Sequence, residues 1–325
     1  MDAAAFETLV ASLRDSRGLA AKADIGLVAE RLGLAGARVP VGDDCAAIPD
    51  GDGHLLLAIE GFMNEFVAAD PWFAGWCGVM VSLSDIAAMG GRPLAVVDAL
   101  WANGEPLAAQ MLDGLRAASH AYGAPIVGGH SNLHNAQGQL AVAVLGRAGA
   151  RLLTSFDAQA GDALVIAADH RGSYRPPFDN FQAALEAPPE RLRADLALLR
   201  ELAERGLARA AKDISQGGVL GTAVMFAESS GVSIDVDLDA IVPPPGVEIE
   251  RWLRTFPSYG YLIAVNPADL VAVLALFHAR DLHAAKIGEI GEGSRVLLTS
   301  AGRSALIRDY AEERLMGLNP KAAAS

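Results

Sequence analysis

The sequence is short of residues that several classes of protein depend on. Its 325 residues include only two cysteines, Cys45 and Cys77, which excludes a disulfide framework or a four-thiolate zinc site within one chain. Lysine and arginine together number 26 against 39 acids, and the formal net charge is −13. Because nucleic-acid binding relies on clustered basic residues, we expect no nucleic-acid partner.

Long apolar runs are also missing. Hydrophobic residues make up 52% of the chain, yet no run reaches the roughly 18 residues of a membrane-spanning helix. The first residues carry acids where a secretory signal carries bases. We therefore expect a soluble, cytoplasmic protein without a membrane partner, and the length suits two domains.

Strand-like and helix-like segments alternate along the chain, which favours an α/β (α+β) architecture over a helix bundle. The clearest helix begins at Asp70 and Pro71, an N-cap followed by proline in the first turn, and continues to residues 89–91. A linker at residues 151–161 separates expected domains at 1–150 and 151–325, and residues 321–325 are expected to form a frayed tail. Other strands are expected at residues 54–59, 93–101, 124–127, 139–147, 163–168, 233–236 and 259–265, and other helices at 106–120, 190–205 and 268–280.

Acids embedded in apolar sequence are the most informative feature that is present. Residues 42–44 read Gly-Asp-Asp, Glu60 ends a strand, Asp85 lies on the apolar helix, and Asp213 follows a strand. One such acid is most simply structural, but burial of an unpaired carboxylate is costly. Mg²⁺ is typically held by one or two carboxylates and by nucleotide phosphates. Acids at four such places therefore predict a metal site, with Asp43, Asp44, Glu60, Asp85 and Asp213 as candidate ligands.

Two glycine pairs are places where backbone N–H groups can approach an anion, although such pairs more often form simple turns. One pair, Gly128 and Gly129, is expected to end a short strand, and the other is Gly217 and Gly218 at a helix start. Four basic residues lie near glycines or loops and are candidate phosphate contacts, with surface solvation as the alternative: Lys22, Arg147, Arg171 and Arg175. The loop at residues 170–177 is a candidate substrate lid.

Four motifs, in this order and spacing, resemble the AIR synthase superfamily. They are the Gly-Asp-Asp-Cys-Ala of residues 42–46, the Ser-Asp-Ile-Ala-Ala-Met-Gly-Gly-Arg-Pro of 84–93, the Gly-Gly-His-Ser of 128–131 and the Asp-Ile-Ser-Gln-Gly-Gly of 213–218. This superfamily includes AIR synthase, thiamine-monophosphate kinase, selenophosphate synthetase and HypE. The resemblance covers essentially the whole chain.

The resemblance implies a two-domain PurM-like fold. In it, the N-terminal sheet forms an intersubunit barrel in a homodimer, and a C-terminal α/β domain covers it. It also implies that ATP and Mg²⁺ bind at the aspartates and that the γ-phosphate passes to a small-molecule acceptor. The resemblance and the residue patterns together give the candidate site. The metal and cofactor residues are Asp43, Asp44, Asp85 and Asp213 with Glu60 assisting, the other cofactor contacts are Gly42, Gly128 and Gly129 with the basic residues Lys22 and Arg147, and the catalytic candidates are His130 and Asp213.

Three positions depart from the superfamily pattern, because Glu60, His130 and Gln216 stand where relatives commonly carry aspartate. The chain also lacks the Cys-bearing loop of selenophosphate synthetase and the Cys-bearing tail of HypE. The leading hypothesis is an ATP- and Mg²⁺-dependent enzyme that phosphorylates an amide, carbonyl or phosphate oxygen, with displacement or ring closure as an optional second step. The alternatives are a catalytically degenerate nucleotide-binding or scaffold protein and, with less weight, a zinc hydrolase using His130 and His134.

Overall fold

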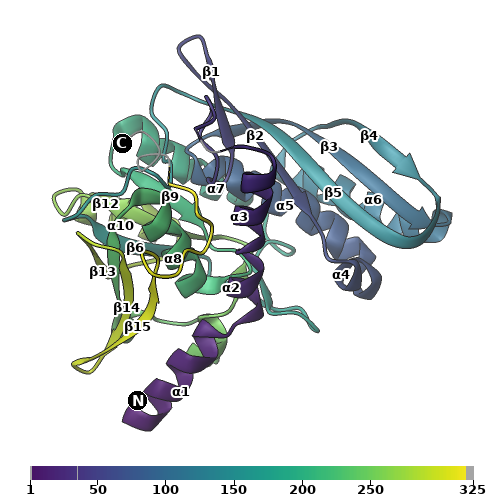
Figure 1. Ribbon diagram of the computed structural model, residues 1–325. Helices are drawn as coiled ribbons and strands as arrows, with labels where there is room; N and C mark the ends of the chain where they lie inside the picture. The colour runs from purple at the N-terminus through teal and green to yellow at the C-terminus, as the bar shows by residue number, and fades with distance from the viewer. Residues whose placement is uncertain (1, 35, 320–325) are drawn as a thin grey trace. The chain divides into compact units, whose positions relative to one another are not determined.

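The computed structural model describes residues 2–34 and 36–319 (Figure 1). The chain forms two compact units, and each draws on segments far apart in the sequence. One unit comprises Met1–Asp43, Leu153–Ala183 and Arg205–Ser325, and the other comprises Asp44–Leu152 and Ala184–Glu204. The predicted boundary near residue 150 thus falls at one crossing between the units, but the N-terminal helices group with the C-terminal part of the chain. The tail predicted at 321–325 lies outside the described residues.

The unit that begins at Asp44 contains a five-stranded sheet and four helices. Its elements are β1 (Ala46–Asp50), β2 (Gly53–Gly61), α4 (Asn64–Ala69), α5 (Pro71–Ala88), β3 (Arg92–Asn103), α6 (Glu105–Tyr122), β4 (Ile126–Asn132), β5 (His134–Ala148) and α7 (Pro189–Arg205). The strand order is β1-β2-β5-β3-β4. All neighbours are antiparallel except β3 and β4, which run parallel.

Helix α5 confirms the clearest prediction from the sequence. The Asp70 carboxylate accepts a hydrogen bond from the Phe73 backbone N–H at 3.1 Å, and Pro71 occupies the first turn. Every residue from Phe73 to Ala88 is buried. A helix that is apolar on all sides is expected to be buried, and α5 packs both on α6 and on the sheet.

The two faces of this sheet differ in what covers them. Glycines of the helix and the sheet mark the close contacts of α5, since Gly78 lies against Val142 and Gly146 lies against Ile86. The opposite face carries exposed apolar side chains, including Leu57 (47% exposed) and Ile59 (68% exposed). Solvent-facing sides of antiparallel sheets are ordinarily polar, so this exposed apolar face requires an explanation.

The other unit contains a seven-stranded sheet of order β15-β14-β10-β13-β6-β12-β9. Its strands are β6 (Ala163–Ala168), β9 (Ala210–Asp213), β10 (Ser233–Asp237), β12 (Gly260–Val265), β13 (His283–Gly291), β14 (Arg295–Ser300) and β15 (Arg303–Asp309). Its helices are α1 (Ala3–Arg14), α2 (Arg17–Ala21), α3 (Asp24–Arg31), α8 (Gly218–Ser230), α9 (Ile249–Trp252), α10 (Leu270–His278) and the 3₁₀ turn η1 (Leu238–Ala240).

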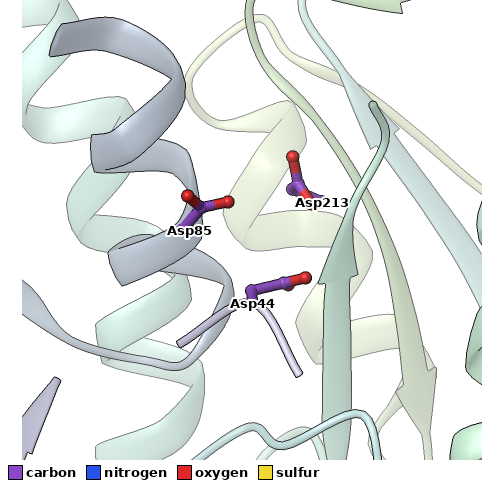
Figure 2. A group of neighbouring side chains, drawn as sticks. All are labelled: Asp44, Asp85 and Asp213. Carbon is purple, nitrogen blue, oxygen red and sulfur yellow. The ribbon is translucent and has the colours of Figure 1, made fainter. Parts of the chain in front are cut away.

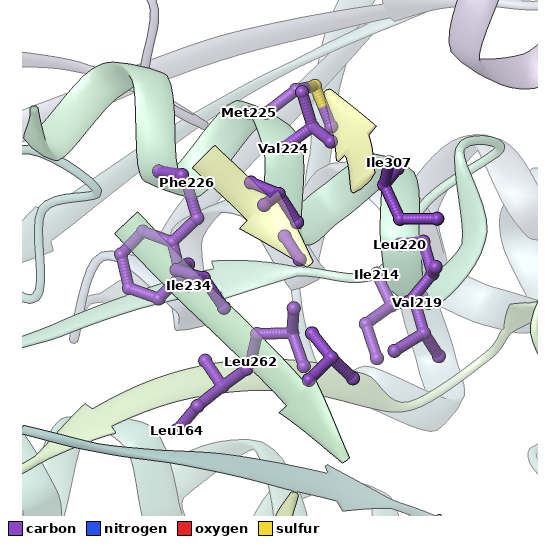
Figure 3. Packing of buried hydrophobic residues seen from close by; sticks show 14 of the residues in the cluster. Leu164, Ile214, Val219, Leu220, Val224, Met225, Phe226, Ile234, Leu262 and Ile307 are labelled. Carbon is purple, nitrogen blue, oxygen red and sulfur yellow. The ribbon is translucent and has the colours of Figure 1, made fainter. Parts of the chain in front are cut away.

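Helix α8 lies at the centre of this unit's hydrophobic core (Figure 3). All 13 of its residues are buried. Val224 and Phe226 of the helix belong to the same cluster as Ile234 of β10 and Leu262 of β12. Burial of apolar area on this scale is the main favourable contribution to folding, and it fixes both ends of α8 in place.

The loop predicted at residues 170–177 is anchored in a three-stranded sheet. Its members are β7 (Ser173–Tyr174), β8 (Asn180–Gln182) and β11 (Phe256–Pro257), in the order β11-β8-β7. The Tyr174 hydroxyl lies 2.6 Å from the Thr255 hydroxyl, and the Arg251 guanidinium stacks 3.5 Å from the Tyr174 ring centre. These contacts hold the segment in one conformation.

The two α/β units confirm the predicted fold class, while the intersubunit barrel stays a prediction. None of the helices within residues 2–34 and 36–319 combines the length and apolar character needed to cross a membrane.

Candidate metal centre

Three of the predicted acids come together. Asp44 precedes β1, Asp85 lies in the last turn of α5, and Asp213 ends β9 (Figure 2). One carboxylate oxygen from each residue lies within 4.8 Å of the others. Asp85 and Asp213 are each 5% exposed, and Asp44 is half-buried. The three side chains therefore form one compact set of oxygen donors.

The position of Asp85 is unfavourable for a carboxylate without a nearby cation. The Met89 backbone N–H donates to the Asp85 carbonyl, which places Asp85 at the C-terminal end of α5. Carbonyl groups give this end of a helix a partial negative charge, so an acid there is disfavoured. Burial and two neighbouring carboxylates add to the cost. A bound divalent cation offsets all three effects.

The donor set fits a hard divalent cation. Mg²⁺ and Ca²⁺ take oxygen ligands, and Mg²⁺ bound to nucleotides generally uses only one or two carboxylates. Opposite ligand oxygens around Mg²⁺ lie roughly 4 Å apart, so the observed spacing needs only small side-chain adjustments. The described residues contain one group of three or more His, Cys, Asp or Glu side chains at metal-binding spacing, and no histidine belongs to it.

Asp43, next to Asp44, lies outside this group. Its carboxylate accepts a hydrogen bond from the Ser155 backbone N–H at 2.9 Å. The preceding residue, Gly42, has φ of 112°, and a β-carbon there would lie 2.9 Å from Cβ of Leu318. Only glycine adopts this backbone conformation readily. Gly42 therefore shapes the turn that leads to Asp44.

Glu60 also lies outside the group. Within its sheet, Glu60 pairs with Val142, whereas Ile86, the neighbour of Asp85, packs on Gly146. Four residues of strand separate these two positions, which corresponds to about 13 Å. Glu60 points toward the helix-covered face of the sheet but stands too far along the strand to join Asp85.

Asp213 is positioned by the edge of the seven-stranded sheet. It pairs with Tyr261 of β12, and the next residue donates its backbone N–H to the Gly260 carbonyl at 2.9 Å. The chain then turns into α8, where Gly218 has φ of 62° and its α-carbon packs against the Leu253 backbone. The second glycine pair thus serves a tight strand-to-helix connection that fixes the Asp213 backbone.

The first glycine pair is placed differently from the sequence-based prediction. The sequence predicts that the strand ends at Gly128 and Gly129, but both lie inside β4, paired with Val97 and Asp98 of β3. A β-carbon at residue 129 would lie 2.6 Å from both the carbonyl oxygen and a carboxylate oxygen of Asp98. Close strand packing therefore explains Gly129. Burial raises the pKa of Asp98, an acid that sequence reasoning missed.

His130 lies on the sheet face opposite α5. It pairs with Ala99, and its ring lies 5.9 Å from the Trp101 ring. Leu100, which lies between Ala99 and Trp101 on β3, points to the face covered by α5 and is fully buried. His130 and His134 line an open hollow of about 550 Å³ near Glu105 at the start of α6. Within this unit, His130 therefore points away from Asp85.

The predicted cationic contacts mostly have structural partners. The Arg147 guanidinium pairs with Asp50 and with Asp52 in the hairpin between β1 and β2. Arg171 pairs with the buried Asp169 at 2.7 Å. Lys22 caps the C-terminal end of α2 and is half-buried.

The fold and the site together define the class of this protein: a two-domain α/β protein in which three aspartates converge. Residues 42–148 match the family of AIR synthase related protein, N-terminal domain, and residues 138–299 match its C-terminal domain family. An uncharacterized protein of Synechocystis sp. is 45% identical over 315 residues, covering 95% of this chain and 97% of that one. The chain belongs to the AIR synthase related protein family.

Two solved structures share the fold. PurL of Thermotoga maritima, solved with ATP, aligns with a TM-score of 0.71 at 17% identity over 91% of this chain and 55% of that chain. A ThiL protein solved with AMPPCP and TMP aligns with a TM-score of 0.64 at 20% identity, covering 86% and 94%. PurL of Methanosarcina barkeri is 25% identical over 77% of this chain. The chain spans 39% of that PurL and about half of the T. maritima chain.

Proposed function

We propose that this protein binds ATP with Mg²⁺ and transfers the γ-phosphate to an oxygen of a small-molecule acceptor. The observation that carries the proposal is the convergence of Asp44, Asp85 and Asp213 from three separate elements. Relatives solved with ATP and AMPPCP support the choice of nucleotide. Acceptor classes that fit this chemistry are amides, carbonyl compounds and phosphorylated metabolites.

Phosphoryl transfer depends mainly on positioning and on charge neutralisation. Asp44, Asp85 and Asp213 would hold Mg²⁺, which supplies neutralisation of phosphate charge. The protein contributes rigidity, since Asp85 is fixed by a buried helix and Asp213 by a paired strand. The N-terminal turns of α8 offer backbone N–H groups near Asp213, and such groups favour phosphate.

Isothermal titration calorimetry with ATP, with and without Mg²⁺, tests the binding step. The proposal expects heat of binding only with metal, and it expects Asp85→Asn to abolish that heat. Asp113→Asn is a matched control, because Asp113 is exposed on α6 and forms an exposed ion pair with Arg116. Nucleotide binding that ignores both metal and Asp85 would rule the proposal out.

ADP release in a screen of amides, amines and phosphorylated metabolites tests the transfer step. Its outcome separates the enzyme from a second candidate, a nucleotide-binding protein without turnover. The orientation of His130 favours that second candidate, because the predicted catalytic imidazole faces away from Asp85 within its unit. Nucleotide that raises the melting temperature without ADP release from any acceptor would support it.

A second copy of the chain is the partner that we propose for the exposed apolar sheet face. Paired residues on neighbouring strands point to the same face. Leu57 pairs with Leu145, and Val97 pairs with Ala143, two residues along β5 from Leu145, so Leu57, Leu145 and Val97 share one face of the sheet. They are 47%, 36% and 39% exposed, and contiguous apolar surface of this kind marks interfaces. Analytical ultracentrifugation should give a dimer for the wild type and a monomer for Ile59→Lys. A monomeric wild type would refute this assignment.

A further inference from the structure

Glu228 is a buried carboxylate with an unusual set of partners. It lies near the end of α8, a helix whose residues are all buried, and is 3% exposed. Its two oxygens accept hydrogen bonds from the backbone N–H groups of Leu315 (3.0 Å), Met316 (3.0 Å) and Gly317 (2.8 Å). Hydrogen bonds to an ionised acceptor are roughly twice as strong as neutral ones. Glu228 therefore fastens the chain segment of residues 315–319 to α8.

The fastened segment reaches the turn before the metal centre. Leu318 packs directly on Gly42, where a β-carbon would come within 2.9 Å of Cβ of Leu318. Leu315, Met316 and Leu318 are all buried, so the segment is part of the core. Its contact with Gly42 fixes the backbone two residues before Asp44.

A second connection from α8 reaches the same turn. The Ser230 hydroxyl donates to the Ser155 carbonyl at 2.6 Å, and the Ser155 N–H donates to the Asp43 carboxylate at 2.9 Å. Glu228 and Ser230, two residues apart near the end of α8, thus support Gly42 and Asp43 by separate routes. The start of α8 follows directly from Asp213. One buried helix is therefore connected to two of the three segments that supply the aspartates.

We propose that Glu228 is a positioning residue of the metal centre, acting through residues 315–319 to fix the Gly42–Asp44 turn. This inference rests on the proposed function, because it presupposes that Asp44, Asp85 and Asp213 bind a divalent cation. Residues that orient metal ligands typically change metal affinity by about 10–100-fold when they are altered. Glu228→Gln keeps the shape of the side chain but replaces one acceptor oxygen with an NH₂ donor and removes the negative charge, so at least one of the three backbone hydrogen bonds is lost and the others are weakened.

The experiment is a titration of Mn²⁺ into the full-length protein, followed by electron paramagnetic resonance at a temperature well below the melting point of each variant. We expect Glu228→Gln to bind Mn²⁺ about tenfold more weakly than the wild type. Hydrogen exchange should show faster exchange of the amides of residues 315–317. Glu312→Gln is the matched control, since it makes the same charge change on an exposed residue of the same part of the chain, and it should bind as the wild type does.

Leu318→Ala keeps the inference testable if Glu228→Gln does not fold, because it leaves the hydrogen bonds of Glu228 in place and removes the Cγ and Cδ atoms of Leu318 that lie against Gly42. It should also weaken Mn²⁺ binding. Wild-type affinity in folded Glu228→Gln, or in Leu318→Ala where Glu228→Gln does not fold, would overturn the positioning role while leaving the proposed function intact. A wild type that binds no Mn²⁺ would overturn both. A purely structural role would lower the melting temperature of Glu228→Gln without changing its Mn²⁺ affinity.

Discussion

Replacement of Asp85 by asparagine should stabilise the metal-free protein and abolish its response to metal and nucleotide. One oxygen from each carboxylate lies within 4.8 Å of the others, and two unit charges about 5 Å apart repel by about 3 kcal/mol at an effective dielectric constant of about 20. Asp85 faces two such charges, and its place in the last turn of α5 adds about 0.3–1 kcal/mol. Other interactions of these acids and the partial exposure of Asp44 reduce the total, so we expect a net gain of about 2 kcal/mol.

Differential scanning fluorimetry measures both halves of this prediction. For a chain of 325 residues, about 2 kcal/mol corresponds to a rise of roughly 3 °C in melting temperature. That rise should be seen with chelator present. Saturating Mg²⁺ and nucleotide at about 100 times Kd stabilise the wild type by about 2.7 kcal/mol, and Asp85→Asn should lose this gain.

The refuting result is a variant that is less stable than the wild type in chelator and that still responds to Mg²⁺ and nucleotide. It would show that Asp85 makes structural contacts that outweigh the repulsion and that the metal binds elsewhere. Asp113→Asn should leave both melting temperatures unchanged, because the ion pair of Asp113 with Arg116 is exposed and contributes little.

Three further predictions concern the parts of the protein outside the metal centre. Burial and the stacked His283 ring lower the pKa of His170 to about 4, and burial lowers the pKa of His283. Because both folded-state pKa values lie below the unfolded value, the free energy of unfolding should be highest above about pH 6.5 and should fall between pH 6.5 and 4. Urea unfolding of His170→Phe should show a weaker fall over this range. Gly129→Ala should destabilise the protein by about 1–3 kcal/mol in chemical denaturation, since the added carbon meets Asp98, whereas Gly128→Ala, with open space around it, should have a much smaller effect. Tyr174→Phe should cost about 1 kcal/mol through the lost hydroxyl contact with Thr255, and unchanged thermal stability would contradict the anchored loop.

The sequence predicted elements well where local signals and burial agree. Helix α5 has an N-cap, a first-turn proline and uninterrupted apolar residues, and its observed bounds of Pro71–Ala88 follow them closely. Strand β6 matches the predicted residues 163–168. In such segments periodicity, capping and packing all favour one conformation.

Contacts with distant strands determine the elements that local sequence signals did not predict. Strand β1 contains Pro49, which argues against a strand, but β1 is at the sheet edge, where a proline is tolerated. Strand β4 extends through two glycines because β3 and close contact with Asp98 hold it. The assignment of residues 1–43 to the unit of the C-terminal sheet depends on contacts between distant segments, which no local pattern encodes.

In the candidate site too, local sequence signals identified some residues, and tertiary contacts determined the roles of others. Apolar context indicated Asp44, Asp85 and Asp213 correctly as neighbours. The same context also indicated Asp43, which accepts a hydrogen bond from Ser155, and Glu60, which lies too far along its strand. Glu228 has a comparable apolar setting, but its role became visible only through three backbone donors more than 80 residues away.

A crystal structure with Mn²⁺ and a non-hydrolysable ATP analogue, recorded at the manganese absorption edge, tests the central claim most directly. We expect an anomalous peak within bonding distance of carboxylate oxygens of Asp44, Asp85 and Asp213, with the phosphates of the analogue on its open side. A peak bound by other residues, or bound analogue with no metal at these three aspartates, would contradict it.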